Sequence, residues 1–303
     1  MSSVLAGWRR VPVPIRAVVA GLAVASAGSF PWAWLAQANL RHVRAVPWGA
    51  AVMAVYLWLY WRFFTGRSWP ASTAAIRREQ SRARPLSASV WAAAILAGIL
   101  GLVASVLLAR LIGRLVVMPH EHVGDISHIP AGTLFAIAAM GALVAGVVEE
   151  IAFRGYMQRP IERRLGPVTA ILVVGVIFGL AHGTHGEWSL VLMPYYMAIA
   201  ATYGVLAWLT DSILPSLALH AGGDLLGALQ LLSGGGSAAA PSGGGATAGA
   251  SGVNGRFWIN LVVLAAIVTA AVWAYRMLAA VVREEAASRS RRVYPPGARS
   301  SPS

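Results

Sequence analysis

Long apolar runs separated by short polar segments dominate this chain. Most runs approach or exceed the roughly 20 residues that an α-helix needs to cross the hydrocarbon core of a bilayer. We therefore predict an all-α fold, a polytopic membrane bundle with about eight transmembrane helices. The predicted spans are residues 17–38, 47–64, 87–117, 132–153, 168–182, 190–209, 213–232 and 257–282.

The first run has two interpretations. Ala23, Val24 and Ala25 resemble the cleavage site of a signal peptide. However, the apolar run continues past them and closes with Trp32 and Trp34, aromatic residues that favour the membrane interface. A retained first span is the preferred interpretation, and cleavage would leave the order of the later spans unchanged.

Changes in composition divide the chain into six parts. Most of the segment before the last span consists of Gly, Ser and Ala, a composition typical of a flexible loop. The predicted parts are a basic cytoplasmic lead (1–16), N-terminal membrane helices with a basic loop (17–131), a helical core (132–232), the flexible loop (233–256), the last membrane helix (257–282) and a disordered basic tail (283–303).

The composition agrees with a membrane protein. Hydrophobic residues make up 57% of the chain and charged residues only 12%, against about a quarter charged in soluble domains. The net charge of +13 raises the question of nucleic acid, but the basic residues lie between apolar runs rather than along one soluble face, so we predict no nucleic-acid partner. The 24 basic residues are all arginine, which with abundant Ala and Gly is typical of a GC-rich bacterial genome. The absence of cysteine excludes disulfides and thiolate chemistry.

The placement of the arginines predicts the topology. Basic residues of short loops stay on the cytoplasmic side of a membrane. With eight spans, most arginines fall in the two tails and in the loops after the second, fourth and sixth spans. The other side holds only Arg41, Arg44, Arg110, Arg114 and Arg256. We therefore predict a multi-pass protein of the cell membrane with both termini in the cytoplasm.

The fourth run ends in charged residues, which are costly in hydrocarbon and mark functional sites by default. Glu150 and Arg154 are four residues apart, so on a helix they share a face and can form an ion pair. Glu149 is rotated by about 100° from Glu150 on an α-helix. One carboxylate is thus neutralised by the arginine while the other stays free to face a cavity.

Two later runs carry histidines among apolar residues. His182 ends the fifth run, and His220 and Asp224 lie four residues apart within the seventh. An aspartate at this spacing can accept a hydrogen bond from one imidazole nitrogen and leave the other for chemistry. A single buried histidine is more often a packing residue than a catalyst. Together, however, ionisable groups on three spans are difficult to explain by packing, because each such group costs roughly several kcal/mol when it is buried without a partner.

At these motifs the chain resembles the CPBP family of intramembrane proteases, also called the ABI or type II CAAX prenyl protease family. The motifs occur in the family's order as Glu149-Glu150-x-x-x-Arg154, Phe178-x-x-x-His182 and His220-x-x-x-Asp224. The resemblance covers about residues 132–232. The third motif ends in Asp rather than Asn, which adds negative charge and leaves open whether Asp224 orients His220, binds a cation or is protonated.

The resemblance implies peptide-bond hydrolysis within a membrane, with a membrane protein or peptide as substrate. It implies that Glu149 is the general base that activates water, with assistance from His182. It also implies that His220 and Asp224 stabilise the oxyanion. In the same scheme, Glu150 and Arg154 hold the helix ends in register. No cofactor is required by this scheme. The same side chains could instead hold a divalent metal such as zinc, although the His-Glu-x-x-His pattern of soluble zinc proteases is absent.

Other functions compete with hydrolysis. The same family fold could serve as a non-catalytic membrane scaffold or a bacteriocin-type immunity protein. A transporter that relays ions is less favoured, because the sequence shows no internal repeat. A rhomboid-like Gly-x-Ser-Gly pattern at 249–252 lies in the low-complexity loop with no later histidine, so it is interpreted as chance. His120, His122 and His128 could bind a metal outside the membrane, but are more simply solvated loop residues. The sequence does not predict an oligomeric state.

Overall fold

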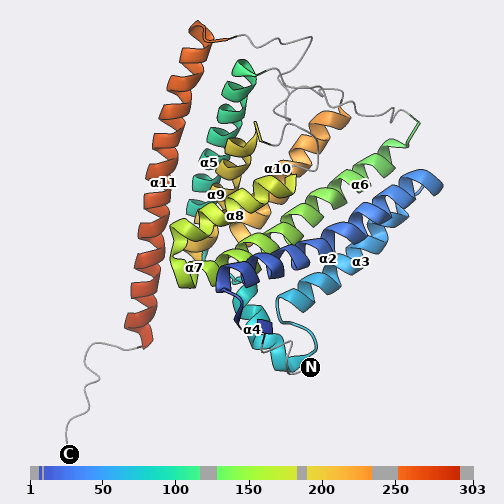
Figure 1. Cartoon of the computed structure of the whole chain (residues 1–303), viewed down its shortest axis with the longest axis horizontal. Coiled ribbons are helices and arrows are strands. Elements are labelled where there is room, and N and C mark those ends of the chain that lie inside the picture. The colour runs from blue at the N-terminus through green and yellow to red at the C-terminus, as the bar shows by residue number, and fades with distance from the viewer. Residues whose placement is uncertain (1–6, 9, 117–127, 183–189, 234–251, 294–303) are drawn as a thin grey trace, which may run out of the picture.

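The computed structural model describes residues 7–8, 10–116, 128–182, 190–233 and 252–293. Within these ranges every regular element is helical, which confirms the predicted all-α bundle (Figure 1). The elements are α2 (Val13–His42), α3 (Trp48–Phe64), α4 (Ala71–Ser81), α5 (Ala88–Leu115), α6 (Ala131–Val144), the π-helix η1 (Ala145–Gln158), α7 (Arg159–Leu165), α8 (Pro167–Ala181), α9 (Met193–Thr210), α10 (Leu214–Leu232) and α11 (Gly255–Val293).

Four of the described helices are long and apolar enough to cross a membrane. They are Val13–His42, Ala88–Leu115, Ala131–Leu165 and Gly255–Arg289, with Pro167–Ala181 as a shorter apolar helix. The predicted total of eight spans stays a prediction. Helix α10 carries His220 and Asp224, and such polar site residues lower the apolarity by which a span is recognised.

The fourth predicted span is longer than its apolar run. Helix α6, η1 and α7 follow one another without a break from Ala131 to Leu165, so the charged motif lies in the middle of a rod rather than at its end near Phe153. The helix continues to Leu165 because its later charged residues form ion pairs. Glu162 pairs with Arg82 and Arg159 pairs with Asp211.

Two further segments differ from the predicted organisation. The basic loop after α3 contains α4, which begins after Pro70 and ends at Arg82 in the left-handed conformation. Helix α11 extends through Val293, although disorder was predicted from Arg283. Polar residues at helical spacing extend α11, since Arg289 forms an i,i+4 ion pair with Glu285. The flexible loop predicted at 233–256 and the tail beyond 293 lie largely outside the described residues.

Close helix packing brings η1 to the centre of the bundle. A Cβ atom on Gly28 of α2 would lie 2.3 Å from a methyl group of Val148, and one on Gly146 would lie 2.8 Å from Ala221 of α10. Glycine at these two positions therefore lets α2 and α10 approach the helix that carries Glu149 and Glu150. Helix α5 packs between α9 and α11 at the opposite edge of the bundle (Figure 1).

Candidate active site

The first motif lies on η1 as a buried ion pair. Glu150 and Arg154 have 0% of their side chains exposed, and Nη1 of Arg154 lies 3.0 Å from Oε1 of Glu150. Their spacing of four residues predicted this pair. The π-helix did not follow from the sequence. It turns less per residue than an α-helix, so Glu149 is rotated from Glu150 by less than the roughly 100° expected.

Three aromatic rings surround the Arg154 guanidinium. Its Cζ atom lies 4.9 Å from the ring centroid of Phe178, 5.1 Å from that of Tyr203 and 5.9 Å from that of Phe153. Aromatic faces attract a cation most strongly where water is excluded. Phe178 also meets Phe153 edge to face, with centroids 5.2 Å apart. The phenylalanine of the second motif therefore packs α8 against the arginine of the first.

His220 connects α10 to this ion pair. Its Nδ1 atom lies 3.0 Å from Oε1 of Glu150, in a buried hydrogen bond. An ionised carboxylate only accepts, so Nδ1 carries the proton. An aspartate four residues from His220 could orient this ring, a role that the sequence left open. Asp224 instead lies 3.8 Å from Nε2, beyond hydrogen-bond distance, and Glu150 takes the orienting role because the helices bring it to the other nitrogen.

Glu149 lies on the other side of the imidazole. Its Oε2 atom is 3.8 Å from Nε2 of His220, and 20% of its side chain is exposed. None of the described residues forms a hydrogen bond with Oε2. Glu149 is therefore the carboxylate that does not pair with Arg154, as the sequence predicted, and it faces Nε2 of His220.

His182 lies at the end of α8. Its Nδ1 atom is 2.8 Å from the carbonyl oxygen of Phe178, and its ring stacks on Tyr196 with centroids 4.8 Å apart. Its ring centroid also lies 4.3 Å from that of Phe178, the ring that packs on Arg154. The three motifs thus converge on one region of the bundle.

Two tyrosines of α9 were missed in the sequence. Tyr203 stacks on His220, with centroids 5.0 Å apart and 19° between the planes, while Tyr196 stacks on His182. They are seven residues apart, which on a helix places both on one face. A search for aromatic residues at helical spacing in the span between the two histidines would have found them.

The predicted metal alternatives have no assembled ligand set here. Over the described parts of the chain, no group of three or more His, Asp or Glu side chains is arranged to hold a metal ion. Of the three loop histidines, only His128 lies within the described residues, and it is exposed. Whether the site takes a metal stays a prediction to be tested.

Comparison with known proteins identifies the segment that holds these residues. The family model described as "Type II CAAX prenyl endopeptidase Rce1-like" matches residues 131–226, from the start of α6 to just beyond Asp224. No curated protein and no solved structure matches the chain. All three motifs lie within this segment, and over these residues the chain is similar to the type II CAAX prenyl endopeptidase family.

Proposed function

We propose that this protein is an intramembrane endopeptidase that hydrolyses a peptide bond in a membrane-associated protein or peptide with a Glu/His site. One observation carries the proposal: Glu149 and Asp224 both lie 3.8 Å from Nε2 of His220. Peptide hydrolysis needs a base for water and a donor for the oxyanion within one site. The protease family of residues 131–226 supports the same reaction.

Glu149 acts as the general base. It is the carboxylate without an arginine partner, and its partial exposure lets a water molecule reach it. The carboxylate takes a proton from water as the water oxygen attacks the carbonyl carbon of the substrate. A general base in such a position accelerates a reaction by about 10²–10⁴-fold.

His220 stabilises the oxyanion that forms on the carbonyl oxygen. Glu150 accepts the hydrogen bond of Nδ1 and Tyr203 holds the plane of the ring, so the direction of Nε2 is fixed before substrate binds. When the ring is doubly protonated, Nε2–H donates to the oxyanion. A donor that is oriented in advance stabilises the transition state without reorganisation.

His182 assists in proton transfer. The carbonyl oxygen of Phe178 can only accept, so Nδ1 of His182 donates to it and Nε2 is the nitrogen that exchanges a proton. Stacking on Tyr196 fixes the ring. In this scheme Nε2 of His182 receives the proton that Glu149 took from water and passes it to the nitrogen of the leaving amine as the C–N bond breaks.

An open surface on α10 gives substrate a route to the site. Asp224 has 48% of its side chain exposed, and a Cβ atom on Gly222 or Gly223 would meet no atom within 4 Å. A peptide segment can therefore approach the backbone of α10 beside Asp224. Such close approach suits an extended substrate, whose scissile bond must reach Glu149.

The proposal does not require a metal, and an experiment separates it from metal-dependent hydrolysis. In the metal-dependent scheme, His220 and the nearby carboxylates would hold an ion such as zinc, which lowers the pKa of its bound water. Purified protein would be assayed before and after treatment with 1,10-phenanthroline, followed by added zinc. Unchanged activity supports the glutamic scheme, whereas loss and recovery with zinc would replace it.

The function is tested by searching for the substrate. Membrane fractions of cells with wild-type protein and with Glu149→Gln would be compared by proteomics, in search of a precursor that accumulates in the variant. The precursor would then be incubated with both purified proteins in proteoliposomes. Cleavage by the wild type alone supports the proposal. Full function of Glu149→Gln or His220→Ala at normal membrane levels would reject hydrolysis and favour a scaffold or immunity protein.

A further inference from the structure

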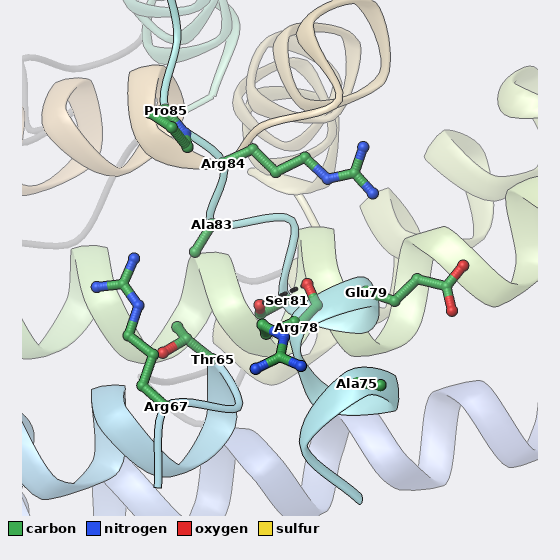
Figure 2. A pocket seen from close by; sticks show the side chains of 9 residues that line it. All are labelled: Thr65, Arg67, Ala75, Arg78, Glu79, Ser81, Ala83, Arg84 and Pro85. Carbon is green, nitrogen blue, oxygen red and sulfur yellow. Dashed lines mark hydrogen bonds between the residues drawn. The ribbon is translucent and has the colours of Figure 1, made fainter.

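A pocket lies outside the candidate active site, at the end of the bundle that holds α4. It has a volume of about 420 Å³ and is lined by residues of α3's C-terminal turn, α4 and the linker that follows α4. Figure 2 shows the lining residues, with Arg67 on the segment after α3, Arg78 on α4 and Arg84 on the linker, and with the three guanidinium groups pointing in different directions. Its volume falls within the range of small-ligand sites.

The pocket has positive charge that the protein itself does not neutralise. Glu79 is the only acidic residue in its lining, and it forms an ion pair with Arg163 at 2.5 Å. The hydrogen bond from Arg163 holds the pKa of Glu79 below its usual range, so Glu79 stays ionised and paired. Arg84 pairs with Asp211 at 2.5 Å.

Arg67 and Arg78 differ from Arg84, because no carboxylate of the described residues lies within ion-pair distance of either. Arg78 donates one hydrogen bond to the carbonyl oxygen of Gly66 at 3.2 Å, and Arg67 lies over the ring of Trp61. Each retains further N–H donors, since a guanidinium has five. Both residues line the pocket, and the N–H donors of a guanidinium suit the oxygens of a phosphate group.

Hydrogen bonds and a tight turn fix the walls of the pocket before any ligand binds. Buried Arg77 donates to the carbonyl oxygens of Ser68 at 2.8 Å and Pro70 at 2.7 Å, which fixes the segment before α4. Gly66 has φ +68°, and a Cβ atom there would lie 2.2 Å from the carbonyl oxygen of Ala74. The tight turn beside Arg67 therefore requires glycine, and the pocket does not have to form around its ligand.

The surroundings of the pocket indicate the depth of a membrane interface. Trp58 and Trp69 are 55% and 86% exposed, and Arg62 lies over the Trp58 ring at 5.1 Å. Exposed tryptophans next to arginines are typical of the headgroup level of a bilayer. A phosphate carried by a lipid would therefore be present at this depth.

We propose that this pocket binds a phosphate group through Arg67 and Arg78, at the level of the lipid headgroups. The ligand chemistry is a phosphate monoester or diester, which an anionic phospholipid carries and free phosphate resembles. Nothing in the proposed hydrolysis uses this pocket, so the inference is independent of it.

Binding is tested on the full-length protein in nanodiscs. Discs of phosphatidylcholine with a small, varied fraction of fluorescent phosphatidylglycerol would report binding by energy transfer from tryptophan. We expect Arg67→Gln combined with Arg78→Gln to weaken binding by about tenfold or more, the factor for losing one charge-assisted hydrogen bond. Arg164→Gln is the matched control, because Arg164 is exposed on nearby α7 but outside the pocket.

A second variant tests the same pocket in case the double variant does not fold. Ala75 is an exposed pocket residue on α4, and Ala75→Glu adds a carboxylate without removing an arginine from its contacts. It should also weaken binding about tenfold while the melting temperature stays that of the wild type. Unchanged binding in both pocket variants would overturn the proposal, as would an equal loss in Arg164→Gln.

Competition distinguishes the two sources of phosphate. If millimolar inorganic phosphate displaces the labelled lipid, and binds by calorimetry with the same dependence on Arg67 and Arg78, then free phosphate is a ligand. If phosphatidylglycerol binds with that dependence and phosphate does not compete, then the ligand is the lipid headgroup. Binding of neither probe to the wild type would reject the site.

Discussion

Two adjacent glutamates allow a matched comparison of catalysis and stability. Glu149→Gln and Glu150→Gln make the same chemical change one residue apart on η1. Glu150 contacts both Arg154 and His220 at 3.0 Å and has no exposed surface. Glu149 approaches His220 only to 3.8 Å and is 20% exposed. We expect the first substitution to remove activity and the second to remove stability as well.

The magnitude follows from what each substitution leaves behind. Glu150→Gln leaves the Arg154 cation buried without a carboxylate, and breaking a buried pair from one side costs about 3–5 kcal/mol. For a chain of this size that corresponds to a fall of roughly 6–10 °C in melting temperature. Glu149→Gln breaks no short contact, so its effect should stay within about 0.5 kcal/mol. Loss of a general base should lower kcat by about 10²–10⁴-fold.

Both variants would be purified in one detergent, melted under identical conditions, and assayed on the same reconstituted substrate. Glu149→Gln should melt like the wild type and be inactive. Glu150→Gln should melt earlier and also be impaired, because His220 loses the acceptor for Nδ1. An equal fall in melting temperature for the two variants would contradict the assignment of the paired and the uncommitted carboxylate. So would an active Glu149→Gln.

Further variants test the site and the ion pairs elsewhere in the bundle. Gly223→Leu fills the open surface of α10, so it should raise KM at least several-fold with an unchanged or higher melting temperature. Tyr203→Leu removes the ring stacked on His220 and should lower kcat about tenfold, whereas Tyr203→Phe should stay within twofold. Asp211→Asn weakens the ion pairs of a partly exposed carboxylate with three arginines, so thermal melting should show a loss of about 1–2 kcal/mol in the free energy of unfolding. Glu79→Gln should destabilise the protein less. Asp224→Asn should keep most of the activity in the same assay.

The sequence predicted the ion pair of the candidate site because that contact is local. A spacing of four residues was enough to predict the pair of Glu150 and Arg154, since side chains four residues apart lie on the same face of any helix with close to 3.6 residues per turn. The partner of His220 could not be predicted in this way. Asp224 is its neighbour along α10, but Glu150 reaches Nδ1 only because Gly146 lets η1 and α10 pack closely. Such contacts depend on tertiary packing, which spacing does not encode.

The boundaries of the helices were predicted less well for a related reason. Apolar runs show where lipid surrounds a helix, and a helix continues beyond the lipid wherever its polar residues find partners. Arg159 and Glu162 extend the η1 rod through ion pairs with residues that are distant in sequence. Helix α4 is polar, with a buried Arg77 bonded to backbone carbonyl groups, so no apolar run marked it.

The expectation for Asp224→Asn depends on which group orients His220. If the charge of Asp224 held the imidazole, an amide would misplace the ring and activity would fall about 10²-fold or more. In the structure Glu150 holds Nδ1, while Asp224 lies 3.8 Å from Nε2 and is 48% exposed. An asparagine keeps the shape of the side chain, and its NH₂ group can donate to an oxyanion, which an ionised carboxylate cannot. Activity within about threefold of the wild type, or above it, would therefore support an oxyanion role for this position. A loss of activity of about 10²-fold or more at normal melting temperature would show that the negative charge itself is needed. Asp224 would then bind a cation or orient His220.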